Sequence, residues 1–105
     1  MRTVALWLVL AASAWAQLPY SATYDTARQV KLKGPVTQIQ WVNPRAFVFI
    51  NVTDATGVTN WAVEIGNPLE LEREGWKRQV LHIGDVVTVD GMPARGDVNQ
   101  AFAMS

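Results

Sequence analysis

Residues 30–42 read Val-Lys-Leu-Lys-Gly-Pro-Val-Thr-Gln-Ile-Gln-Trp-Val, a run in which a glycine and a proline interrupt an otherwise strand-like sequence. The apolar residues before Gly34-Pro35, such as Leu32, and those after it, such as Trp41, stand at opposite parity along the chain. Because side chains alternate between the two faces of a strand, this change of parity indicates a bulge or a sharp bend. We therefore predict a strongly curved first strand that pairs in both halves of a sheet.

The remaining strands follow from apolar alternation bounded by turn residues. Asn43-Pro44 ends the first strand, because the residue before a proline is held extended and proline has no N–H to donate. A second turn at Ile83-Gly84-Asp85 leads into a strand that Gly91 is expected to end. The predicted strands are residues 46–52, 58–65, 86–90 and 98–104, with a hairpin loop at residues 53–57.

One short helix is predicted between the third and fourth strands. Asn67 suits the N-cap, Pro68 the first helical position, and Glu70 has capping-box spacing, while Gly75 is a natural stop. Three strands, one helix and two strands, with a bent first strand, are the layout of an OB-fold. We predict a mainly β fold, a small five-stranded OB-fold-like barrel with one short helix between strands 3 and 4. A split sandwich is the alternative.

The first sixteen residues have the pattern of a signal peptide. Arg2 precedes an uncharged apolar run, and Ala14-Trp15-Ala16 is a small-x-small cleavage site, so we expect cleavage after Ala16 and a periplasmic or secreted protein. The apolar run is too short for a membrane span, so no stable membrane insertion is expected after cleavage. An N-terminal arm is expected at residues 17–29, anchored by Tyr20 and Tyr24, ahead of the barrel domain at residues 30–105.

Composition argues against several functions. The sequence has nine basic and nine acidic residues, and loss of Arg2 with the leader leaves a slight acidic excess, so a nucleic-acid partner is not expected. There is no cysteine and one histidine, His82, which is interpreted as a turn residue. Outside the leader the serines are Ser21 and Ser105, too peripheral for a nucleophile and base pair. No catalytic residue, metal site or cofactor is predicted, because zinc needs three or four converging ligands.

Binding is the better supported hypothesis. The predicted core takes one parity of the second and third strands: Val48, Ile50, Val52, Trp61 and Val63. Phe47 and Phe49 then stand on the outer face beside Ala62 and Glu64, where OB-folds carry their ligands. The candidate ligand-binding residues are Trp41, Arg45, Phe47, Phe49 and Glu64. The ligand could be a small molecule, a glycan or an exported partner protein.

Several alternatives stay open. The arm or the helix could cover the aromatic face, or the face could be the interface of an accessory subunit in an exported complex. A carboxylate-based hydrolase would use Glu64 and Asp90 across a cleft. A metal carrier is a further, weaker possibility.

Four ordered blocks carry a resemblance to a known family. They are Trp-Val-Asn-Pro-Arg-Ala-Phe-Val-Phe at 41–49, Asn-Trp-Ala-Val-Glu at 60–64, Gly-Trp at 75–76 and Gly-Asp-Val-Val-Thr-Val-Asp-Gly at 84–91. Together they resemble the secreted bacterial family called domain of unknown function 6152. The resemblance implies an exported OB-like domain and supplies no activity. Members often carry a histidine pair at the mature start and a histidine after the Asn-Pro turn, where this chain has Pro19-Tyr20 and Arg45, so any metal site of the family is expected to be lost here.

Overall fold

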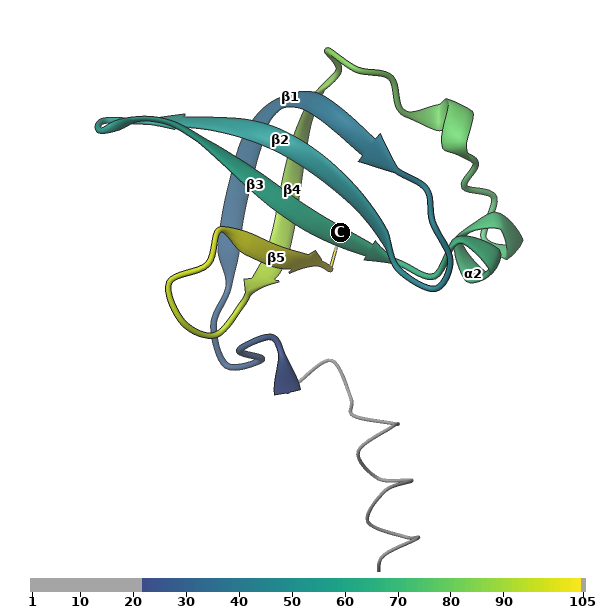
Figure 1. Ribbon diagram of the computed structural model, residues 1–105, viewed down its shortest axis with the longest axis horizontal. Coiled ribbons are helices and arrows are strands. Elements are labelled where there is room, and N and C mark those ends of the chain that lie inside the picture. Colours follow the sequence, from purple (N-terminus) through teal and green to yellow (C-terminus); the bar gives the residue numbers. More distant parts are fainter. Residues whose placement is uncertain (1–21, 105) are drawn as a thin grey trace, which may run out of the picture.

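The computed structural model describes residues 22–104, which form a closed five-stranded barrel with one short helix (Figure 1). The predicted leader at residues 1–16 and the predicted anchor Tyr20 lie outside the described residues. The strands are β1 (Val30–Gln40), β2 (Ala46–Asp54), β3 (Gly57–Gly66), β4 (Val86–Pro93) and β5 (Gln100–Ala103). They are arranged β1-β2-β3-β5-β4, and β4 closes on β1. The pairs are antiparallel except β3 with β5, so the OB-fold-like barrel is confirmed.

The bend in β1 lets this strand close the barrel. Its first half, residues 30–35, pairs with β4, and the second half pairs with β2 from Val36 onward. The register shifts between Val36 and Gln38, so the parity change falls at Thr37 and not directly at Gly34-Pro35 as the sequence suggested. Gly34 has a different part in the bend, because a Cβ at this position would overlap the carbonyl oxygen of Asn51 on β2. The missing side chain therefore permits the close crossing of two strands.

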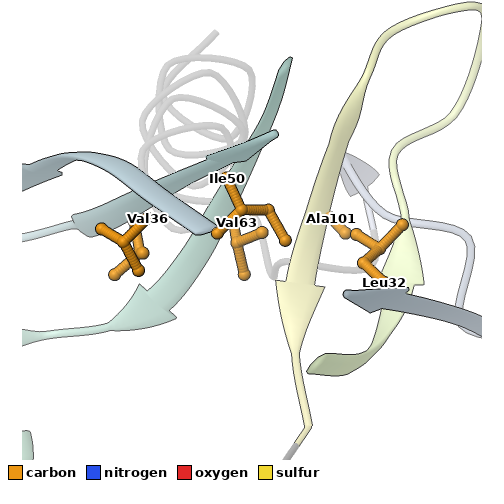
Figure 2. Packing of buried hydrophobic residues seen from close by; sticks show 6 residues of the cluster. Leu32, Val36, Ile50, Val63 and Ala101 are labelled. Atoms are coloured by element: carbon orange, nitrogen blue, oxygen red, sulfur yellow. The ribbon is translucent and has the colours of Figure 1, made fainter. Parts of the chain in front are cut away.

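The core fills the barrel from all five strands. Figure 2 shows Leu32 and Val36 of β1 with Ile50, Val63 and Ala101, which come from β2, β3 and β5. Val48, Ile50 and Val63 are buried as predicted, and Val52 and Trp61 are half-buried against the same cluster. The predicted face assignment of β2 and β3 is therefore correct.

The last two strands differ from their predicted bounds. Gly91 was expected to end the fourth strand, but β4 continues to Pro93. Gly91 keeps an ordinary strand conformation, and a Cβ there would stand 2.6 Å from the carbonyl oxygen of Phe102 on β5. The glycine thus marks a close backbone approach instead of a turn. The last strand, β5, is confined to Gln100–Ala103.

The helix α2 (Pro68–Arg73) has the predicted termini. The side chain of Asn67 accepts a hydrogen bond from the Leu69 amide at 2.8 Å. At the other end Gly75 has φ 96°, and the Trp76 amide donates to the Leu71 carbonyl at 2.8 Å, so a Schellman motif ends the helix. A 3-10 turn, η2 (Arg78–Val80), follows.

The α2 helix buries little of its own surface. The only buried residue within it is Pro68. No helix among residues 22–104 combines the length and the apolarity that a membrane crossing requires.

Candidate functional site

The predicted binding face lies on the outside of β1, β2 and β3. Phe47 on β2 stands opposite Gln40 on β1 and Glu64 on β3. One step along the sheet, Phe49 stands opposite Gln38 and Ala62. We call this surface the outer face. It consists of the outward side chains of these two cross-strand rows, Arg45, and the asparagine pair in the next row of β2 and β3. Its members are Gln38, Gln40, Arg45, Phe47, Phe49, Asn51, Asn60, Ala62 and Glu64.

Two phenylalanines form the apolar centre of the outer face. The ring centroids of Phe47 and Phe49 are 6.3 Å apart, with an interplanar angle of 30°. The guanidinium carbon of Arg45 lies 5.2 Å from the Phe47 centroid, a cation–π contact. Both rings are half-buried, and neither belongs to the buried core clusters. Each ring therefore keeps part of its surface available for contact.

Amide side chains flank the aromatic pair. The Asn60 side-chain amide donates to Asn51 Oδ1 at 2.8 Å and to Thr37 Oγ1 at 3.0 Å, which fixes its orientation across β1, β2 and β3. Gln38 and Gln40 are exposed on β1 and face the two phenylalanines in the register of the sheet. An amide carries both a donor and an acceptor, so this border can bind hydroxyl groups in either direction.

Glu64 lies on the outer face by register, but it is buried. Its Oε1 accepts a hydrogen bond from the Tyr24 hydroxyl at 2.6 Å, and its two oxygens receive Arg45 Nε at 2.9 Å and Nη2 at 2.7 Å. The Tyr24 hydroxyl also accepts a bond from the Gln100 amide at 2.8 Å. The side chain of Glu64 is 9% exposed, although its register position on the outer face would place it in solvent. Tyr24 covers it, and the arm is thereby attached to β3.

The electrostatics of this group favour a buried ion pair. Burial by itself raises the pKa of Glu64, but the hydrogen bonds from Arg45 and Tyr24 and the positive charge of Arg45 outweigh burial and hold it below its usual range. The hydrogen bond to Glu64 raises the pKa of Arg45. Burial, and then the hydrogen bond to Glu64, raise the pKa of Tyr24 to about 12. At neutral pH the tyrosine is a neutral donor to an ionised carboxylate.

Alkaline pH is expected to weaken the attachment of the arm. Above pH 10 the tyrosine of the unfolded chain loses its proton, whereas folded Tyr24 keeps its proton until about pH 12. The stabilisation of the folded state by protonated Tyr24 is therefore complete below pH 10. This stabilisation, about 3 kcal/mol at most, is lost as pH rises through 12. Urea unfolding at pH 9 and pH 11.5 measures this loss of unfolding free energy. In Tyr24→Phe the unfolding free energy should fall less between the two pH values. An equal fall in both proteins would contradict the coupling of Tyr24 protonation to stability.

The structure separates the other candidate residues from this group. Trp41 lies one residue past the end of β1 and is half-buried, and among residues 22–104 it forms no ring pair with Phe47 or Phe49. Asp90 is on β4 and pairs with Lys31 at 3.8 Å on the surface. Because β5 runs between β3 and β4, and both oxygens of Glu64 are already bonded, the geometry gives no support to a hydrolytic pair of Glu64 with Asp90.

His82 belongs to a turn. Its backbone amide donates to Asp85 Oδ2 at 2.9 Å, and its Nδ1 lies 3.7 Å from the same oxygen. Within the part of the chain that the structure describes, no three side chains of metal-ligating type converge.

Sequence reasoning missed the polar group under the arm. Tyr24 was expected to anchor the arm, and it is 1% exposed. Its partners Glu64 and Gln100 are 40 and 76 residues away in sequence, so no local pattern connects them. The available signal was a carboxylate at an outward strand position beside an arginine, which in the register of the barrel becomes an ion pair.

Comparison with known proteins gives a family without a function. The family model described as "Family of unknown function (DUF6152)" matches residues 6–102, nearly the whole chain. None of the curated proteins searched matches the sequence.

Proposed function

Given that the chain belongs to the family of unknown function DUF6152, we propose that it is an exported, non-enzymatic binding domain whose recognition surface is the outer face of β1, β2 and β3. Export rests on the leader predicted at residues 1–16. The observation that carries the proposal is the half-exposed Phe47–Phe49 pair, bordered by amide side chains and set on rigid strands. Sites built on strands hold their geometry better than sites on loops.

The composition of the outer face favours a neutral oligosaccharide over the other ligands of OB-folds. OB-folds bind oligonucleotides or oligosaccharides on this side of the barrel. A polyanion would need free basic side chains, but Arg45 is committed to Glu64 and the chain has no basic excess. Aromatic rings offer flat apolar surfaces to the C–H faces of sugars, and the exposed amides of Gln38 and Gln40 suit the hydroxyl groups.

Loss of one ring is expected to weaken binding. Isothermal titration of the purified protein with malto-, cello- and chito-oligosaccharides should find one series that binds saturably, and Phe49→Ala should lower its affinity at least about tenfold, or about 1.4 kcal/mol. Val58→Ala is the matched control, because Val58 is 63% exposed at the far end of the β2–β3 hairpin. It should bind as the unmodified protein does.

The titration also distinguishes oligosaccharide binding from the main rival hypothesis, in which the outer face is a protein interface. Absence of binding across all three saccharide series would contradict the oligosaccharide assignment. A defined exported protein that binds stoichiometrically and loses affinity with Phe49→Ala, but not with Val58→Ala, would identify the face as the interface of an accessory subunit.

A further inference from the structure

A concave site lies at one end of the barrel, away from the outer face. It is a pocket of about 340 Å³ between the barrel and the segment that connects β3 to β4. Its floor includes Val48 and Val63, which belong to the core cluster, so the pocket continues the interior of the barrel outward. Volumes of this size hold small organic ligands.

The connecting segment leaves this end of the barrel incompletely covered. Leu71 and Leu81 line the pocket and are half-buried, whereas Trp76 also lines it and is 43% exposed. Met104, which also lines the pocket, is 55% exposed. Side chains of this size that surround a concavity and remain in water gain free energy when an apolar molecule covers them.

The charge of the pocket restricts the kind of ligand. Among the described residues that line it, Glu74 is the only charged one, and the remainder are apolar except Thr88. The carboxylate of Glu74 makes no hydrogen bond or ion pair with any residue in the range 22–104. An unpaired negative charge at the rim disfavours fatty acids and other anions by like-charge repulsion.

We propose that this pocket binds a small uncharged apolar molecule, whose body enters the end of the barrel between Trp76 and Met104. The site is independent of the outer face, since none of its lining residues belongs to that face. Occupation buries the Trp76 indole and excludes water from the half-covered end of the core.

The test uses the neutral probe N-phenyl-1-naphthylamine and the purified protein. The probe should bind saturably with increased emission, and energy transfer from tryptophan should fall in Trp76→Phe. Ala103→Leu adds bulk inside the pocket and should weaken binding at least tenfold. Leu81→Phe, on the connecting segment, tests the same point without altering a strand. Val98→Leu is the control, because Val98 is 55% exposed and does not line the pocket.

Competition tests the charge of the rim. Decanol should displace the probe at least tenfold better than decanoate, and Glu74→Gln should narrow that difference. Phe49→Ala should leave probe binding unchanged, which separates this site from the proposed saccharide face. Unsaturable probe binding, or equal affinity in Ala103→Leu, Leu81→Phe and Val98→Leu, would overturn the pocket assignment. Equal displacement by decanol and decanoate would overturn the choice of an uncharged ligand.

Discussion

Gly34→Ala is expected to destabilise the domain by at least about 3 kcal/mol, because the new Cβ has to occupy the position of the Asn51 carbonyl oxygen. To remove this overlap, β1 and β2 would have to move apart. The overlap lies at the bend of β1, where the pairing partner of this strand changes from β4 to β2. The free energy of unfolding, measured in urea by circular dichroism, gives the loss. If the variant fails to fold, the recovered soluble fraction reports the same effect.

Gly84→Ala provides the comparison for Gly34→Ala. Gly84 has φ 96° and open space around its Cα, so alanine meets no atom there and costs only backbone strain, about 1 kcal/mol. A loss in Gly34→Ala no larger than that in Gly84→Ala would contradict the close crossing of β1 and β2.

Arg45→Met is expected to cost about 2–3 kcal/mol at pH 7, because it leaves the carboxylate of Glu64 buried with only Tyr24 as a donor. The figure is set below that of a fully buried pair because the Arg45 side chain is 51% exposed. In the unmodified protein the pKa of Glu64 is lowered. Ionised Glu64 therefore stabilises the folded state above the usual pKa of a glutamate, and this stabilisation is lost as pH falls. The difference between the two proteins should therefore shrink as pH is lowered from 7 to 4.

Lys31→Met is the matched control for the ion pair. Lys31 and Asp90 also form an ion pair between a basic and an acidic side chain, but these side chains are 73% and 54% exposed. Such surface pairs contribute well under about 1 kcal/mol. Urea unfolding at pH 7 and pH 4 compares the two variants. Equal losses in Arg45→Met and Lys31→Met would contradict the claim that the buried carboxylate of Glu64 depends on its ion pair with Arg45.

The fold could be predicted because its determinants are local. Alternation in β2 placed Val48 and Ile50 in the core, and Asn67 and Gly75 gave both ends of the helix. The bend of β1 was also visible, although its bulge falls at Thr37. Gly91 was misread, because a glycine looks the same in sequence whether it permits a turn or a close approach of two strands.

The candidate site was only partly predictable. The outward direction of Phe47 and Phe49 follows from strand parity, and the structure places the two rings together. The burial of Glu64 does not follow, because it depends on where the arm passes over β3 and on the pairing of β3 with β5. The pocket at the end of the barrel depends on the path of the segment between β3 and β4, which no periodic pattern describes.

The most direct test of the proposed function is a two-dimensional ¹⁵N–¹H NMR titration of the purified protein with malto-, cello- and chito-oligosaccharides. We expect shifts confined to the backbone amides of the outer face, around Gln38, Phe47, Phe49 and Asn60, with the amides near Trp76 and Val89 unchanged. Shifts centred on the connecting segment and β4, or no shifts with any of these oligosaccharides, would contradict the assignment of the outer face as an oligosaccharide-binding surface.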